Sequence, residues 1–147
     1  MKILMNESEQ ERTMSANETG KAERIKVLLV DDEEAYVRIL EKRLTKRNFA
    51  VGMAFSGIQG VQAVRKEEFD VAVLDLKMED IDGIEVLKIF KALVPQMAVI
   101  MLTGHGSEEA ARDGIQYGAY DYLLKPCDFD DLVEKIKQAA GRRAGSG

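Results

Sequence analysis

Short apolar runs alternate with amphipathic segments along most of this chain. Three of the runs, KVLLV, VAVL and AVIML, are continuous rather than alternating, which is typical of strands buried on both faces of a parallel sheet. Together with two weaker runs they predict five strands, at residues 26–30, 50–55, 71–74, 98–102 and 120–124.

The segments between these runs have a helical period. In the first of them, EEAYVRILEKRLTKR, the apolar side chains share one face, formed by Val37, Leu40 and Leu44. Residues suited to helix N-caps precede three of the other segments, at Ser56, Ser107 and Asp128. The alternation of strands and helices, with short connections, predicts an α/β fold: a doubly wound five-stranded parallel sheet with helices on both faces and right-handed crossovers.

The two ends of the chain lack this pattern. Residues 1–24 are polar and charged without a sustained period, so we expect a disordered N-terminal arm. The sequence GRRAGSG at residues 141–147 predicts a flexible tail. Residues 25–140 remain as one domain, which is long enough to bury a single core.

Composition argues against several classes of protein. The formal net charge is -5, so the chain has no overall basic field for nucleic acid or an anionic membrane, and we expect direct contact with neither. Cys127 is the only cysteine, which rules out a disulfide framework and fits a reducing compartment. The sequence also lacks the ~20 apolar residues of a membrane span and the apolar segment of a signal peptide. We therefore expect a cytoplasmic protein.

Polar side chains follow four of the predicted strands. They are Asp31 and Asp32, then Asp75, Thr103 and Lys125. Alone, the first two aspartates would more often cap a helix, and Asp75 could begin a turn. Because ligands bind outside the carboxyl ends of the strands in open parallel sheets, the coincidence of all five favours one joint site.

Three carboxylates at one sheet edge need positive charge beside them. At ~5 Å and an effective dielectric constant near 20, each pair costs about 3 kcal/mol. Lys125 supplies one charge, and a divalent metal would supply the rest. The ligands are hard oxygens, which favour Mg²⁺, or Mn²⁺ in its place, over Zn²⁺. Since Mg²⁺ is commonly completed by a phosphate oxygen and a carboxylate is a known nucleophile, the site points to phosphoryl transfer.

The motifs VLLVDDE, VLDLKMEDIDG, MLTGHGS and YLLKP resemble the hallmarks of response-regulator receiver domains, the CheY-like phospho-accepting partners of sensor histidine kinases in two-component and phosphorelay systems. The resemblance extends from Ile25 to about Ala140. It implies a flavodoxin-like fold with strand order 2-1-3-4-5. It also implies that Asp75 is the phosphoacceptor and a metal ligand, that Asp32 binds Mg²⁺ directly, that Asp31 binds it through water, and that the Lys77 carbonyl completes the set.

The resemblance assigns roles to the remaining motif residues as well. Thr103 would hydrogen-bond the phosphoryl group and Lys125 would pair with it. Tyr122 would be the rotamer switch that follows Thr103 inward, and the Lys125–Pro126 peptide bond would be cis. Lys77 and His105 would modulate the lifetime of the phosphoryl group. For His105 this role is favoured over the two alternatives, a solvated loop residue and a catalytic group.

Three positions depart from the family pattern. Glu79 stands where many receivers have proline, so we expect a more mobile loop after Asp75. Gly104 follows Thr103 where alanine or serine is common, which gives Tyr122 more room. Cys127 replaces a frequent aromatic residue, and packing is a simpler role for it than redox sensing.

Because the chain leaves no room for an output domain after the receiver, we expect a stand-alone response regulator. It is expected to catalyse only its own phosphorylation and dephosphorylation, and to signal through a protein partner or a histidine phosphotransfer protein. The expected readout face combines the helix after LTGHG, the fifth strand and the last helix. The alternative is a constitutive binding module that keeps the fold without the chemistry.

Other features of the sequence have more than one interpretation. The first helix has a basic face that is either solvated or a docking surface for the kinase, formed by Arg38, Lys42, Arg43, Lys46 and Arg47. A dinucleotide site is disfavoured because the turn after the first strand is acidic and lacks the glycine fingerprint. A dehalogenase-type phosphatase is disfavoured because Lys77 stands where its second aspartate would be.

Overall fold

The computed structural model describes residues 24–104 and 107–146, with side chains described as far as Gly141. The arm predicted at residues 1–24 therefore lies outside the described residues except for Arg24. The elements in chain order are β2 (Lys26–Val30), α3 (Glu34–Lys46), β3 (Ala50–Ala54), α4 (Gly57–Lys66), β4 (Val71–Asp75), α5 (Gly83–Leu93), β5 (Ala98–Thr103), α6 (Glu108–Gln116), β6 (Asp121–Leu124) and α7 (Phe129–Ser146).

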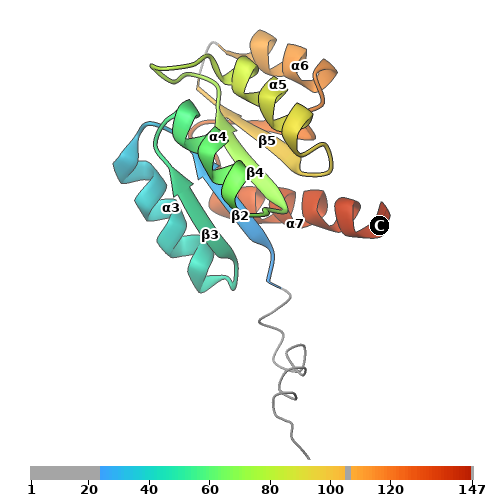
Figure 1. The fold of residues 1–147 in the computed structure, drawn as a ribbon. Helices are drawn as coiled ribbons and strands as arrows, with labels where there is room; N and C mark the ends of the chain where they lie inside the picture. The colour runs from blue at the N-terminus through green and yellow to red at the C-terminus, as the bar shows by residue number, and fades with distance from the viewer. Residues whose placement is uncertain (1–23, 105–106, 147) are drawn as a thin grey trace, which may run out of the picture.

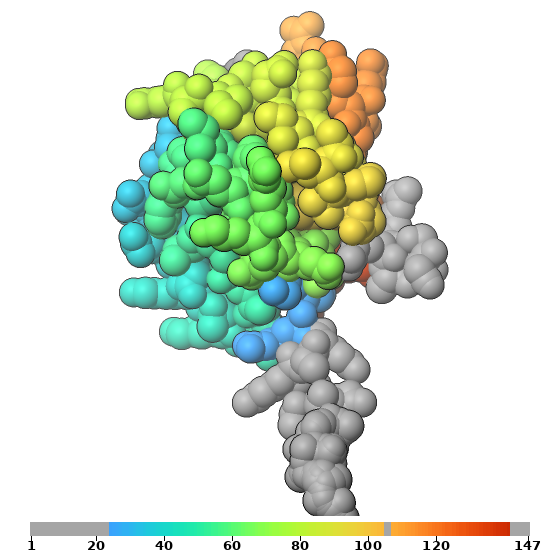
Figure 2. Space-filling view, viewed as in Figure 1, coloured from blue at the N-terminus to red at the C-terminus, as the bar shows by residue number. Residues whose placement is uncertain are grey.

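The five strands form one parallel sheet in the order β3-β2-β4-β5-β6. Since β2 is the first strand along the chain, this is the order 2-1-3-4-5, which confirms the predicted fold class and strand order. Helices α3 and α7 pack on one face of the sheet, and α4, α5 and α6 pack on the other. Figure 1 shows this layered arrangement. In the space-filling view of Figure 2, α4 and α5 lie next to each other over the second face.

Each strand contributes to two separate hydrophobic cores, one on each face. In β2, Val27 and Leu29 pack under α3 and α7, whereas Leu28 and Val30 pack under α4 and α5. All four side chains are buried, because successive residues of a strand point to opposite faces. This double burial is the reason that the strand sequences are continuously apolar.

Some boundaries differ from those expected. Asp75 and Thr103 are the last residues of their strands rather than the first residues beyond them, because the pairing with the neighbouring strands continues to these positions. Phe55 lies outside β3, since its N–H binds the side-chain oxygen of Gln59 instead of a neighbouring strand. Ser56 caps α4 as predicted, by accepting the N–H of Gln59, whereas the Ser107 side chain makes no cap hydrogen bond.

The last helix is longer than the sequence suggested. We expected a tail from residue 141, but α7 continues to Ser146. Arginine and alanine favour helix, and the two glycines of this segment, Gly141 and Gly145, cost only about 1 kcal/mol each within one. At its other end, α7 begins with Asp128 accepting the N–H of Asp131, as predicted for an N-cap.

Part of the basic face of α3 packs against α7. The guanidinium groups of Arg43 and Arg47 lie 4.0 and 5.1 Å from the centre of the Phe129 ring. Arg47 also forms an ion pair with Asp130, at 2.6 Å. These two arginines are therefore already engaged within the domain, as is Arg38, which pairs with Glu34 at 3.6 Å and lies 5.0 Å from the centre of the Phe55 ring.

Gly83 is required by close contact at the start of α5. A Cβ atom there would lie 2.8 Å from the carbonyl oxygens of Asp75 and Leu76, and nearer still to the Leu76 Cα. We expect Gly83→Ala to lower the free energy of unfolding by about 2 kcal/mol, because backbone atoms have to move. Urea denaturation measures this, with Gly141→Ala as the control, since nothing lies within 4 Å of a Cβ there. Equal stability of the two variants would contradict the prediction.

Candidate functional site

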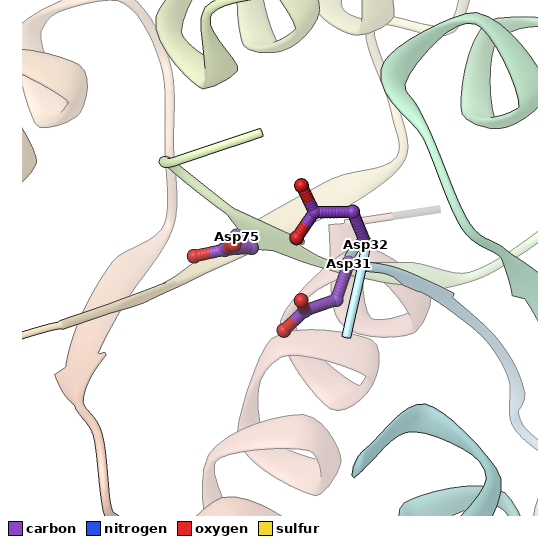
Figure 3. Close-up of side chains that lie close together, drawn as sticks. All are labelled: Asp31, Asp32 and Asp75. Carbon is purple, nitrogen blue, oxygen red and sulfur yellow. The ribbon is translucent and has the colours of Figure 1, made fainter. Parts of the chain in front are cut away.

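Three carboxylates meet at the carboxyl ends of β2 and β4. Asp31 and Asp32 directly follow β2, and Asp75 ends the neighbouring strand β4. Each side chain offers one oxygen atom, and these atoms lie within 4.8 Å of one another (Figure 3). Asp31 and Asp75 are buried and Asp32 is exposed. The predicted convergence of the three aspartates is therefore present in the fold.

Lys125 brings a positive charge to this group from the end of β6. Its Nζ lies 2.7 Å from Oδ2 of Asp31 and 3.9 Å from Oδ1 of Asp75. Its backbone N–H donates to the carbonyl oxygen of Thr103, at 2.7 Å, and its peptide bond with Pro126 is cis. The ammonium group thus contacts Asp31 directly, whereas Asp75 is at the edge of its reach.

Glu33 is a fourth acidic group at the site, and the sequence reasoning did not include it. Its Oε1 lies 2.8 Å from Nζ of Lys125. Its backbone N–H also donates to Oδ1 of Asp31, at 2.9 Å. The DDEE motif contains the signal, but an exposed glutamate next to an aspartate pair is more often an ordinary surface residue.

Burial and mutual repulsion alter the acidity of these groups. Burial, followed by the nearby charge of Asp31, raises the pKa of Asp75 to about 6, while Lys125 and the Lys77 N–H oppose the rise. For Lys125, burial lowers the pKa, but hydrogen bonds from its ammonium group to Asp31 and Glu33 outweigh this and the pKa is raised. The site therefore keeps its lysine charged and disfavours the charged form of Asp75, which a further cation would stabilise.

The described donor set fits a hard divalent cation. All three aspartates present carboxylate oxygens, which Mg²⁺ and Mn²⁺ prefer. Asp32 is exposed and accepts the N–H of Glu79 through Oδ2, at 3.3 Å. Lys77 lies in the loop directly after β4, with its side chain exposed and its N–H donating to Asp75.

The remaining predicted site residues are Thr103, Tyr122 and His105. Thr103 is fully buried at the end of β5, the strand beside β4, and its hydroxyl lies 3.5 Å from the Gly104 carbonyl oxygen. Tyr122 is half-buried on β6 and packs against the core under α4, α5 and α6. His105 lies outside the described residues, so its modulatory role stays a prediction.

Tyr36 and Cys127 lie close to Lys125. The Lys125 ammonium lies 4.9 Å from the centre of the Tyr36 ring, and the Tyr36 hydroxyl hydrogen-bonds the Cys127 thiol. Burial raises the pKa of the Cys127 thiol, which keeps it protonated and less reactive. This environment is typical of a packing cysteine.

The sequence matches the family model of the response regulator receiver domain over residues 27–137. It is 39% identical over 115 residues to the transcriptional regulatory protein ZraR of Escherichia coli (strain K12), covering 78% of this chain and 26% of that protein. It is 34% identical over 117 residues to the acid tolerance regulatory protein ActR of Rhizobium meliloti (strain 1021), covering 80% of this chain and 60% of that one. The chain thus spans about a quarter of the length of ZraR.

Solved structures agree with this assignment. The CheY-like response regulator receiver domain protein from Methanospirillum hungatei JF-1 superposes with a TM-score of 0.81 and 31% identity, over 84% of this chain and 99% of that chain. NtrX from Brucella abortus, in complex with ADP, gives 0.80 and 26% identity, over 84% of this chain and 28% of that chain. None of the helices that the structure describes has both the length and the apolar character needed to cross a membrane. This chain belongs to the response regulator receiver domain family, the phospho-accepting domains of two-component systems.

Proposed function

We propose that this chain is a phosphorylation switch in which Asp75 accepts a phosphoryl group from a sensor histidine kinase or a histidine phosphotransfer protein. The observation that carries the proposal is the meeting of Asp31, Asp32 and Asp75 beside Lys125 at the carboxyl edge of the sheet. Receiver domains typically bind Mg²⁺ at an acidic pocket and take phosphate from histidine kinases. A constitutive binding module would need no such concentration of charge.

Asp75 is the nucleophile in this proposal. One of its carboxylate oxygens forms a bond to phosphorus while the bond from phosphorus to the imidazole nitrogen breaks, and the electron pair of that bond stays on the imidazole. Asp31, Asp32, Asp75 and the Lys77 carbonyl would hold Mg²⁺, which supplies positive charge beside the phosphoryl oxygens when bound. The Thr103 hydroxyl donates to a phosphoryl oxygen.

Lys125 has to change partners during this reaction. In the structure its ammonium group is held by Asp31 and Glu33, and Asp75 is 3.9 Å away. A phosphoryl group on Asp75 brings additional negative charge within reach of the Lys125 ammonium. Lys125 therefore releases Glu33 and binds a phosphoryl oxygen instead. The exchange moves the β6–α7 loop relative to α3.

The signal leaves through a protein surface. The phosphoryl group favours the state in which Thr103 and Tyr122 have moved, which alters the face made by α6, β6 and α7. The partner that reads this face is a protein. Stand-alone action stays a prediction, because relatives such as ZraR are several times longer than this chain.

Acetyl phosphate tests the chemistry without the kinase. With Mg²⁺ present, we expect the protein to gain the mass of one phosphoryl group, as measured by intact-protein mass spectrometry. A chelator should prevent the gain, because the carboxylates then lack the cation that neutralises them. Glu79→Gln, which removes a neighbouring charge outside the reacting groups, should still be modified. An unmodified wild-type mass would favour the constitutive binding module.

A further inference from the structure

The loop between β4 and α5, residues 76–82, is attached to the start of α4. Asp80 in this loop accepts the N–H of Gly57 through Oδ1, at 3.0 Å, and the N–H of Ile58 through Oδ2, at 2.9 Å. These are the first two residues of α4, where backbone N–H groups have no partner within the helix. The third N–H, of Gln59, is accepted by Ser56. Asp80 therefore fills the part of the helix end that Ser56 leaves open.

The chemistry of this contact favours a charged Asp80. Hydrogen bonds from Ile58 and Gly57 lower the pKa of its carboxyl group. The N-terminus of a helix also attracts negative charge. Packing around the contact is close, since a Cβ atom on Gly57 would lie 3.4 Å from Oδ1 of Asp80 and 2.9 Å from Val86.

The same loop is attached to the acidic site one residue earlier. The backbone N–H of Glu79 donates to Oδ2 of Asp32, at 3.3 Å. Proline, which many receivers have at this position, has no N–H and could not make this bond. The loop that we expected to be more mobile is thus attached at two successive residues, to Asp32 on one side and to α4 on the other.

We propose that Asp80 is a positioning residue for the metal side of the acidic site. By fixing the loop on the end of α4, it holds the Glu79 N–H against Asp32 and the Lys77 backbone beside Asp75. This inference rests on the proposed function, because it assumes that the three carboxylates bind Mg²⁺. Groups that fix the orientation of a metal ligand commonly affect metal affinity strongly, although they do not contact the ion themselves.

The affinity for Mg²⁺ tests this role directly. We expect Asp80→Ala to raise the dissociation constant of Mg²⁺ about tenfold, measured by calorimetry on unphosphorylated protein. At saturating Mg²⁺, the rate of phosphorylation by acetyl phosphate should return to the wild-type rate, because the reacting groups are intact. A merely destabilised variant would not separate metal affinity from the maximal rate in this way.

Two matched variants separate positioning from simpler effects. Ser56→Ala removes a cap hydrogen bond from the same end of α4 but keeps the two backbone donors of Asp80, at Gly57 and Ile58. Glu79→Gln removes a negative charge from the neighbouring residue but keeps the backbone N–H. We expect each to change the dissociation constant less than about twofold. The Glu79 charge is exposed and screened by salt, and the neutral Ser56 takes no part in the two hydrogen bonds of Asp80. Thermal unfolding of the metal-free proteins confirms that each variant is folded.

The outcomes are distinct. An unchanged dissociation constant in Asp80→Ala, with clear binding by the wild type, would overturn this inference and leave the proposed function standing. The same is true if Ser56→Ala or Glu79→Gln reproduces the full effect. Absence of Mg²⁺ binding by the wild type would overturn the proposed function and this inference together.

Discussion

Without divalent metal at pH 7 to 8, Asp75→Asn is expected to be more stable than the wild type, by up to about 3 kcal/mol. Burial and the charge of Asp31 raise the pKa of Asp75 from its ordinary value of 3.8 to about 6. The folded protein therefore binds the Asp75 proton more tightly than the unfolded chain does. The stabilisation from this proton is complete below pH 3.8 and is lost as the pH rises through 6. Asparagine has no charge to bury, so the variant avoids that loss.

Chemical denaturation at a series of pH values measures this effect. The difference between the two proteins should shrink toward pH 4, where Asp75 is protonated in the folded wild type. It should also shrink when Mg²⁺ is added, because the cation stabilises the charged carboxylate in the wild type. Asp32→Asn is the control, since Asp32 is exposed and its charged form loses little solvation on folding. A variant that is less stable than the wild type at pH 8 would contradict the electrostatic description of the site.

Lys125→Met should have the opposite effect on stability. It leaves the buried Asp31 and Asp75 without the ammonium that lies 2.7 and 3.9 Å from them. Removing one partner of a largely buried ion pair costs about 3 kcal/mol, and we expect that loss of unfolding free energy at pH 7 without metal. The loss should diminish in acid, where Asp75 is protonated. Phosphorylation by acetyl phosphate should slow about a hundredfold, because charge on the phosphoryl group is no longer neutralised.

Lys135→Met is the matched control for this variant. Lys135 also forms a short ion pair, at 2.6 Å from Asp121, but both partners are more exposed. Its loss should cost less than about 1 kcal/mol and leave the phosphorylation rate unchanged. Equal destabilisation by the two substitutions would show that Lys125 has no special place in the acidic group.

The sheet and the central acidic group could be predicted from the sequence. Strands buried on both faces have to be continuously apolar, so KVLLV and VAVL are recognisable without a structure. Parallel strands bring their carboxyl ends to one edge, so Asp31 and Asp75 were expected together although they are far apart in sequence. Strand ends were less certain, because Asp75 and Thr103 are polar yet still paired.

The supporting contacts could not be predicted in the same way. Glu33 meets Lys125 across 92 positions of the chain, and Asp80 meets the start of α4 across 22 and 23. Both are exposed acidic residues, a type that is common on any surface. Their roles depend on where loops pass each other in space, and no periodicity in the sequence records that.

The assignment of Asp75 as the phosphoacceptor is the central claim, and chemical trapping tests it most directly. Protein treated with acetyl phosphate and Mg²⁺ is reduced with borohydride, which converts a phosphorylated aspartate to homoserine, and the peptides are sequenced by mass spectrometry. We expect homoserine at position 75 in the wild type and at no position in Asp75→Asn. Homoserine at position 31 or 32, or its absence from the wild type, would contradict the claim.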